Sequence, residues 1–323
     1  MFDNVAERQV GYISRLLSFV IPCYRSESTI RLVVDEIVET MVERDTFDYE
    51  IICVNDCSPD QVYHVLQKLA EENPRVKVIS LAKNMGKHAA ILAAFSVAQG
   101  EYIVNIDDDF QCPTHNLWRL LEPLELDQCD FATAVYKKKK QALWKNVGST
   151  VNHWMSSVLL NKPQEIRFEN FSIMKRFVMD EILKYTRPYP YLEGLVLRVT
   201  HRIVMVEMEE RERADHHKTG FTFRKSMSLW FNGFTAFSVK PLRIATIIGF
   251  LTALCGFVLG IYLVIQRLIH SEMPAGYTSL IAVQLFSSGM IMIGLGLVGE
   301  YVGRIYICIN NSPQYVIKET INI

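Results

Sequence analysis

The 323-residue sequence lacks the cysteine patterns of a disulfide framework or a structural zinc site. Its seven cysteines are scattered, and only Cys53 and Cys57 lie close together, at the end of a predicted strand. Zinc sites use paired cysteine spacings, and disulfide scaffolds are short and rich in cysteine. We therefore expect reduced thiols in a reducing compartment.

An excess of positive charge is also lacking. The formal net charge is −1, whereas nucleic-acid binding requires a sustained basic surface. We therefore expect no nucleic-acid partner. The first 17 residues include Asp3, Glu7, Arg8 and Arg15 and have no apolar segment. This pattern predicts no cleavable signal peptide and an N-terminal part that stays in the cytoplasm.

Apolar residues are abundant, at 50% of the chain. From Leu17 to about Val135, short apolar runs alternate with longer stretches whose apolar residues recur three and four positions apart. This alternation is typical of strands joined by crossover helices in a parallel sheet. The expected strands are 18–22, 49–55, 76–81, 102–106 and 130–135, and the expected helices are 28–43, 60–72 and 87–99. The fold class predicted for this part is α/β with a mostly parallel sheet.

Two longer apolar runs, at about 242–265 and 278–299, follow in the second half. Each exceeds the roughly 18 to 20 residues that a helix needs to cross the hydrocarbon of a bilayer. The connector between them is short and contains Pro274 and Gly276. The two runs are therefore predicted to form a transmembrane hairpin that returns to its starting side.

Positive charges orient this hairpin. Lys240, Arg243 and Arg304 flank its outer ends, whereas the connector has only Arg267. Positive flanks favour the cytoplasm, so we expect a multi-pass membrane protein with its α/β domain in the cytoplasm. The expected parts are a cytoplasmic α/β domain at 1–220, a juxtamembrane interfacial helix at 221–240, a hairpin at 241–303 and a cytoplasmic C-terminal tail at 304–323.

Two amphipathic segments accompany the hairpin. Residues 137–160 open with four lysines and continue with Trp144 and other apolar residues at helical spacing, and residues 222–239 contain Trp230 and Phe234. Such helices can lie at a membrane surface, although the first could equally be a surface helix packed on the sheet. Pairs of glycines four apart within the hairpin could allow close helix contacts, including contacts between protomers of a homo-oligomer.

Polar loops follow three of the predicted strands, at 22–27, 55–60 and 107–111. Ligands of open parallel sheets bind at the carboxyl ends of the strands. Asp107 and Asp109 are two residues apart, so in extended backbone their carboxylates project to one side and can bind a hard cation, Mg²⁺ or Mn²⁺. Such a cation would hold a diphosphate leaving group. The alternative is an acidic cluster that caps a turn or the next helix.

Two further residues are candidates for nucleotide binding. Asp56 can accept hydrogen bonds from a nucleobase imide or a ribose hydroxyl. Lys87 follows a glycine and opens a predicted helix, so it could face phosphate oxygens. A glycine before a helix is also ordinary turn chemistry.

These segments resemble family 2 glycosyltransferases of GT-A fold, and within them the polyprenyl-phosphate glycosyltransferases. The resemblance spans nearly the whole chain. It rests on Ile-Pro-Cys-Tyr at 21–24, Val-Asn-Asp-Cys-Ser-Pro-Asp at 54–60, Asn-Met-Gly-Lys-His-Ala-Ala at 84–90 and Asp-Asp-Asp-Phe-Gln at 107–111, with Lys-Pro-Leu-Arg at 240–243 and Gly-Glu-Tyr-Val-Gly-Arg-Ile-Tyr at 299–306.

The resemblance implies an inverting transfer of a sugar from a nucleotide-diphosphate sugar, most commonly a UDP-sugar, to undecaprenyl or another polyprenyl phosphate, for modification of cell-envelope polysaccharide or lipid. The implied donor-binding residues are Pro22, Tyr24, Glu27, Asp56, Lys87, Asp107 and Asp108. The implied metal ligands are Asp107, Asp109 and Gln111, and the implied catalytic residues are Asp109, Arg213 and Glu169.

Several of these assignments have alternatives. Arg213 is preferred to Arg211 as the basic residue near the phosphates, but both lie in a charged run that could simply be solvated. Glu169 stands where relatives often have an aspartate that has been proposed as a base, and Glu193 stands where an arginine is common. A catalytically silent membrane scaffold of the same fold is the second function class. A processive polysaccharide synthase is disfavoured because the sequence lacks a Gln-x-x-Arg-Trp segment.

Overall fold

The computed structural model describes residues 15–44, 46–136, 167–188, 190–209, 211, 247–252, 276–310 and 313–323, with single positions between 254 and 269. Two compact units make up the chain. The first comprises Met1–Asn146, Glu165–Gly220 and Pro313–Ile323, and the second comprises Val147–Gln164 and Phe221–Ser312. The two units are described separately below.

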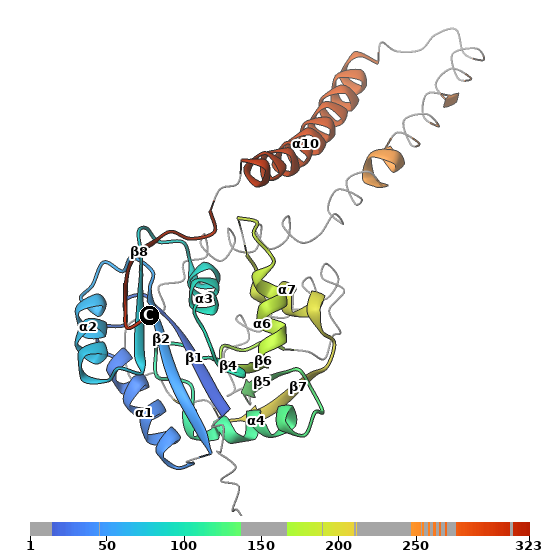
Figure 1. The fold of residues 1–323 in the computed structure, drawn as a ribbon. Coiled ribbons are helices and arrows are strands. Elements are labelled where there is room, and N and C mark those ends of the chain that lie inside the picture. The colour runs from blue at the N-terminus through green and yellow to red at the C-terminus, as the bar shows by residue number, and fades with distance from the viewer. Residues whose placement is uncertain are drawn as a thin grey trace, which may run out of the picture. The chain divides into compact units, whose positions relative to one another are not determined.

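A mixed sheet forms the centre of the first unit (Figure 1). Its strands are β1 (Arg15–Cys23), β2 (Phe47–Asn55), β3 (Val76–Leu81), β4 (Tyr102–Asn105), β5 (Phe131–Tyr136), β6 (Ser172–Lys175), β7 (Ile203–Met208) and β8 (Ile317–Ile321). The strand order is β7-β5-β6-β4-β1-β2-β3-β8. Strand β6 runs antiparallel to β4 and β5, and β8 runs antiparallel to β3, while the other pairings are parallel. The predicted α/β class is confirmed, and the five predicted strands correspond to β1 through β5.

Helices cover both faces of this sheet. They are α1 (Ile30–Val42), α2 (Val62–Glu72), α3 (Lys87–Phe95), a 3₁₀ turn η1 (Thr114–Asn116), α4 (Leu117–Glu125), α6 (Arg176–Leu183) and α7 (Leu192–Val199). The three predicted helices correspond to α1, α2 and α3, and α3 ends four residues earlier than expected. Its Ala-rich sequence lets it lie close to the sheet, where the seven residues from Ala89 to Phe95 are all buried.

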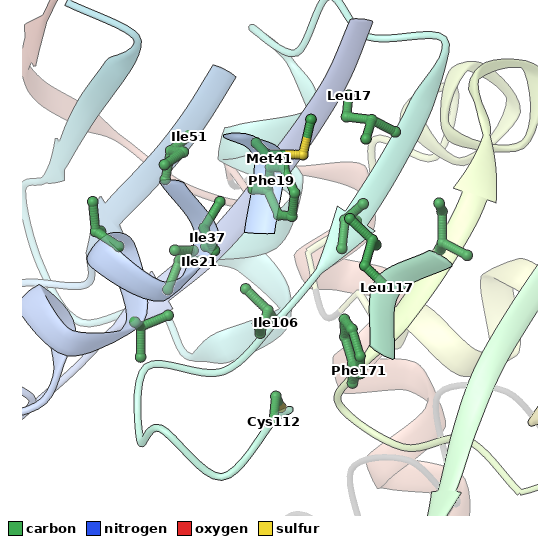
Figure 2. Packing of buried hydrophobic residues seen from close by; sticks show 14 of the residues in the cluster. Leu17, Phe19, Ile21, Ile37, Met41, Ile51, Ile106, Cys112, Leu117 and Phe171 are labelled. Atoms are coloured by element: carbon green, nitrogen blue, oxygen red, sulfur yellow. The ribbon is translucent and has the colours of Figure 1, made fainter. Parts of the chain in front are cut away.

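The main hydrophobic core lies between the sheet and helices α1, α2 and α4. Alternate residues of β1, among them Phe19 and Ile21, face Ile37 and Met41 of α1 (Figure 2). This alternation follows from the period of two along a strand, and the spacing of four between Ile37 and Met41 places both on one side of a helix. Burial of this face fixes the register of β1, and with it the position of the loop that follows Cys23.

The C-terminal residues join the same sheet. From the sequence, residues 304–323 are expected only as a tail, but β8 pairs with the edge of β3, where Val78 lies opposite Ile321. The side-chain amide of Asn322 donates to the carbonyls of Ala70 and Val76, both at 2.9 Å. The chain therefore leaves the first unit after β7 and returns to it before β8.

In the second unit, α10 (Tyr277–Ile309) is the principal described element. It is 33 residues long. Its segment Phe286–Gly303 has a mean hydropathy of 1.3 and sufficient length to cross a bilayer, and it is the one such helix among the described residues. Large apolar side chains are exposed along it, including Phe286, Met292 and Val298. A helix that is apolar on all sides is typical of a membrane span.

Much of the predicted membrane region lies outside the described residues. This holds for most of the first predicted span, where residues 247–252 are helical, and for both amphipathic segments with Trp144, Trp230 and Phe234.

Candidate active site

Three loops form the candidate site at the carboxyl ends of β1, β2 and β4. Each contains a non-glycine residue in the left-handed region, with φ of 60° at Arg25, 49° at Cys57 and 61° at Phe110. Such backbone is sparsely populated by residues with a Cβ and persists where the surroundings enforce it. The three loops that the sequence singles out therefore each contain unusual backbone, which is also present at Asp127 and Asn322.

Hydrogen bonds join the loop after β1 to the loop after β2. The backbone N–H of Arg25 donates to Oγ of Ser58 at 2.8 Å. The N–H of Glu27 donates to Oδ2 of Asp60 at 3.1 Å, and the Glu27 carboxylate accepts from the N–H of Gln61 at 2.7 Å. Glu27 therefore contacts the start of α2, and its predicted contact with a nucleoside stays a prediction.

Pro22 and Tyr24 frame the first of these loops. Pro22 is buried within β1 and lies opposite Val54 of β2. The ring of Tyr24 is 43% exposed, and the Arg25 guanidinium lies 5.6 Å from its centroid. An exposed aromatic ring beside a cation is suited to stack on a planar base, which keeps Tyr24 as a candidate for nucleoside binding.

Asp108 joins the loop after β4 to the loop after β1. Its Oδ2 accepts the N–H of Tyr24 at 2.9 Å, and its backbone carbonyl accepts the hydroxyl of Thr29 at 2.5 Å. Burial raises the pKa of Asp108 to about 7, against the opposing effect of hydrogen bonds from Ser26 and Tyr24. Asp108 thus fixes the position of the β1 loop, a role different from that of the aspartates on either side of it.

Asp56 organises the loop between β3 and α3. Asp56 is buried, with 3% of its surface exposed. Its carboxylate accepts hydrogen bonds from the N–H groups of Met85 at 2.7 Å and Gly86 at 2.9 Å. Burial raises the pKa of Asp56, and these two backbone hydrogen bonds oppose the rise. Gly86 has φ of +85°, a conformation that a residue with a Cβ rarely adopts. Direct contact of Asp56 with a nucleoside stays a prediction.

Lys87 connects α3 to the aspartate loop. Its Nζ lies 2.5 Å from Oδ1 of Asp107 and 2.7 Å from Oδ1 of Asn170. Asn170 follows Glu169, whose N–H donates to Oγ1 of Thr133 at 3.1 Å. The structure therefore brings together the predicted residues Lys87 and Asp107, and it places the predicted Glu169 next to Asn170 in the chain. No pattern in the sequence singles out Asn170, because its contact with Lys87 depends on the pairing of β6 with β4.

Asp109 and Gln111 complete the aspartate loop. The N–H of Gln111 donates to Oδ1 of Asp109 at 3.2 Å, and the Gln111 side chain donates to the carbonyl of Arg211 at 3.5 Å. Among the described residues, no three His, Cys, Asp or Glu side chains gather as a metal site. Two carboxylates and one amide oxygen suit a hard cation that takes its remaining ligands from a diphosphate and water. The lysine ammonium beside Asp107 also shows that a positive charge fits there.

Arg211 contacts this loop at Phe110 and pairs with Glu36 of α1. Its guanidinium donates to both carboxylate oxygens of Glu36, at 2.8 and 3.0 Å, and lies 4.5 Å from the centroid of the Phe110 ring. Burial of Glu36 raises the pKa of its carboxyl, but the hydrogen bonds and charge of Arg211 outweigh this and hold the pKa below its usual value. The preference for Arg213 over Arg211 stays a prediction, since Arg213 lies outside the described residues.

Comparison with known proteins identifies the family of this site. The profile described as glycosyl transferase family 2 matches residues 18–183. The chain belongs to this family. It is a glycosyltransferase, and the resemblance drawn from the loop motifs is confirmed. A second profile, the GtrB C-terminal hairpin, matches residues 240–305 of the glycosyltransferase.

Curated relatives match over nearly the full length. The uncharacterized glycosyltransferase YkcC of Bacillus subtilis is 31% identical over 95% of this chain and 94% of its own. A prophage bactoprenol glucosyl transferase homolog of Escherichia coli is 30% identical over 94% of this chain and 98% of its own. The undecaprenyl-phosphate 4-deoxy-4-formamido-L-arabinose transferase of Proteus mirabilis is 26% identical over 95% of this chain and 94% of its own.

Solved structures share the fold of the catalytic domain. Glucosyl-3-phosphoglycerate synthase of Mycobacterium tuberculosis, in complex with Mn²⁺ and UDP-glucose, aligns with a TM-score of 0.51 and 18% identity. The alignment covers 68% of this chain and 77% of the other. The expected GT-A architecture is therefore confirmed at the level of the fold.

Proposed function

We propose that this glycosyltransferase transfers a sugar, with inversion, from a nucleotide-diphosphate sugar to undecaprenyl or another polyprenyl phosphate at the cytoplasmic face of the bacterial inner membrane. The observation that carries the proposal is that one chain contains both the Asp107 loop bound to Lys87 and a helix long and apolar enough to cross a bilayer. A soluble donor and acceptor would give no reason for such a helix.

The donor end of the site is built for a nucleoside diphosphate. Exposed Tyr24 offers a stacking surface beside the polar loop after β2. Lys87 and the N-terminus of α3 face the loop that contains Asp107 and Asp109. Positive charge and helix N–H groups favour phosphate oxygens. UDP is the carrier that we favour, because a relative of the same fold was crystallised with UDP-glucose.

Asp107, Asp109 and Gln111 would hold the metal, Mg²⁺ or Mn²⁺. A bound divalent cation would stabilise the charge that develops on the diphosphate as the glycosidic bond breaks. The chain's own contribution is orientation, because Asp108 joins the aspartate loop to the loop after β1 and the Gln111 side chain donates to the backbone carbonyl of Arg211.

The acceptor phosphate needs positioning more than deprotonation. A phosphate monoester has a second pKa near 6 and is largely anionic at pH 7. Glu169 can therefore serve as an orienting or basic group without being essential for proton removal. Relatives named for bactoprenol and undecaprenyl phosphate support a lipid acceptor.

The path of the chain supports a hairpin rather than a single span. Strands β7 and β8 belong to one sheet, yet α10 lies between them in the sequence. A chain that starts and ends in the same domain must cross a bilayer an even number of times. Because α10 supplies one crossing, a second crossing is expected between 212 and 276, where the first predicted span and the hairpin profile fall.

The test is transfer from a panel of radiolabelled nucleotide sugars to undecaprenyl phosphate by the purified full-length protein, with Mn²⁺ or EDTA. We expect lipid labelling that requires the metal and is lost in Asp109→Asn. Labelling that persists in EDTA and in this variant would contradict the metal assignment. Absence of nucleotide and metal binding would favour the scaffold alternative.

A further inference from the structure

A cluster of three side chains includes His88, the residue after Lys87, and has no role in the donor contacts described above. His88 follows Lys87 in the first turn of α3, Tyr191 precedes α7 and Glu193 lies in the first turn of α7. The rings of His88 and Tyr191 meet edge to face, with centroids 5.5 Å apart and an interplanar angle of 73°. The hydroxyl of Tyr191 donates to Oε2 of Glu193 at 2.6 Å.

One ring nitrogen of His88 lacks a hydrogen-bond partner among the described residues. Its Nδ1 is buried and has no hydrogen-bond partner in the part of the chain that the structure describes. A buried polar atom without a partner costs about 1 to 3 kcal/mol, so such atoms often mark a position that a ligand fills. Burial and the charge of Lys87 lower the pKa of His88 to about 4. The imidazole is therefore neutral at pH 7 and has one donor and one acceptor nitrogen.

Glu193 has acceptor capacity left over. Its Oε2 is engaged by Tyr191, whereas Oε1 has no hydrogen-bond partner among the described residues. The carboxylate is partly exposed, and the hydroxyl of Tyr191 holds it in place. A fixed carboxylate beside an aromatic ring and a neutral imidazole is suited to hydroxyl groups, because it offers acceptors, one donor and an apolar surface.

The position of the cluster links it to the leaving group. His88 is the neighbour of Lys87, and Lys87 contacts Asp107 of the aspartate loop. A sugar attached to a diphosphate at Asp107 and Lys87 would extend from these residues, and His88 is the next side chain along α3.

We propose that His88, Tyr191 and Glu193 form the subsite that binds hydroxyl groups of the donor sugar and selects which sugar is accepted. This inference rests on the proposed use of a nucleotide sugar. A site built to hydrogen-bond a hydroxyl discriminates strongly against a sugar that lacks or misplaces it, because its polar groups would be left unpaired.

Binding measurements test the subsite without any lipid acceptor. The affinities of UDP, UDP-glucose, UDP-galactose, UDP-N-acetylglucosamine, GDP and GDP-mannose are measured by calorimetry on the detergent-solubilised full-length protein with Mn²⁺. In the wild type we expect one sugar to bind at least about tenfold more tightly than its epimer on the same nucleotide. In Glu193→Gln this preference should fall to about twofold or less, with the affinity for the free nucleoside diphosphate within twofold of wild type.

Two further variants separate binding from folding. Tyr191→Phe removes the hydroxyl that holds Glu193 and keeps the ring, so it should weaken the preference less than Glu193→Gln. Glu181→Gln removes an exposed carboxylate on α6 that pairs with Lys184, and it should leave the preference unchanged.

The possible outcomes are distinct. The subsite is overturned if the wild type does not distinguish sugars on one nucleotide, if Glu193→Gln retains the preference, or if that variant loses nucleoside diphosphate affinity to the same extent. If the preference behaves as expected but undecaprenyl phosphate is not labelled, the lipid acceptor is wrong while the sugar subsite stands.

Discussion

The guanidinium of Arg211 donates to both carboxylate oxygens of Glu36, at 2.8 and 3.0 Å, across the interface between α1 and the end of the described β7 segment. The same residue covers the Phe110 ring, and its backbone N–H donates to the Gln111 carbonyl at 3.4 Å. Arg211 therefore supports the aspartate loop through Phe110 and Gln111, and its charge is already paired with that of Glu36.

This arrangement predicts different results for two arginines in one charged run. Arg211→Met should lower the free energy of unfolding by about 1 to 3 kcal/mol, because Glu36 loses the partner of its half-buried charge. Arg213→Met should instead reduce sugar transfer at least about tenfold, equivalent to about 1.4 kcal/mol, if Arg213 contacts the phosphates. Unfolding and transfer assays on both variants check this.

The pairing itself can be tested with a second substitution. In Glu36→Gln the carboxylate charge is absent, so adding Arg211→Met should cost less stability than it costs in the wild type. Equal costs in the two backgrounds would show that the ion pair contributes nothing. Loss of transfer in Arg211→Met without loss of stability would instead place Arg211 at the phosphates.

Replacing Lys87 should change the binding of the metal and of the nucleotide in opposite directions. Its ammonium lies against Asp107, where the metal is expected, and would move to the diphosphate when metal and donor bind. Lys87→Met should therefore bind Mn²⁺ alone more tightly and bind UDP in the presence of Mn²⁺ about tenfold more weakly, equivalent to about 1.4 kcal/mol. Electron paramagnetic resonance of free Mn²⁺ and calorimetry of UDP measure the two effects.

The matched control is Lys83→Met, which removes an exposed lysine from the same β3–α3 connection. It should change neither affinity by more than about twofold. Weaker Mn²⁺ binding in Lys87→Met would mean that the lysine orders the aspartates rather than competing with the cation.

The sequence predicts best those elements whose residues are close together in the chain and whose burial follows from a local apolar pattern. Strand β3 begins and ends at the predicted residues, because a short apolar run followed by polar residues defines a buried parallel strand. The site loops were located for the same reason, since polar residues directly after such strands must lie at one edge of the sheet.

The remaining features depend on contacts between residues that are distant in the chain. Ile317–Ile321 forms β8 only because the edge of β3 is available to it. The role of Asp108 required the knowledge that the N–H of Tyr24, 84 residues earlier, points at its carboxylate. The sequence pattern alone made Asp107, Asp108 and Asp109 look equivalent.

Replacing Gly86 with alanine tests whether the loop after β3 needs its observed backbone conformation for stability and for UDP binding. Its φ is +85°, and its N–H donates to Oδ2 of Asp56 at 2.9 Å. No atom lies within 4 Å of the position that a Cβ would take, so Gly86→Ala introduces backbone strain without a clash. We expect a loss of stability of about 1 to 2 kcal/mol and weaker UDP binding, measured by thermal unfolding and calorimetry.

Gly100→Ala provides the contrast. An added Cβ there would lie 2.6 Å from Oγ of Ser18, within the interior of the domain. This variant should lose stability without a specific change in the UDP affinity of the folded protein. Equal weakening of UDP binding in both variants would indicate a general effect of instability rather than a role for the β3–α3 loop.

His88 predicts a pH dependence of stability. Its pKa is lowered to about 4 in the folded protein by burial and by Lys87, against about 6.5 in an unfolded chain. Between these values the unfolded state binds more protons, so the contribution of neutral His88 is fully present above about pH 6.5 and is lost as the pH falls toward 4. The loss is about 2 kcal/mol between pH 7 and pH 5, and about 3 kcal/mol at pH 4.

His88→Gln should remove this part of the pH dependence. Glutamine retains a polar side chain but does not titrate, so the difference in unfolding free energy between pH 7 and pH 5 should shrink by about 2 kcal/mol. His64→Gln is the control, because His64 is exposed on α2 and its replacement should leave the dependence unchanged. If His88→Gln has the same pH dependence as the wild type, the imidazole must be accessible to protons in the folded state. It would then be charged near pH 5, and its place in a sugar subsite would have to be argued for an imidazolium instead.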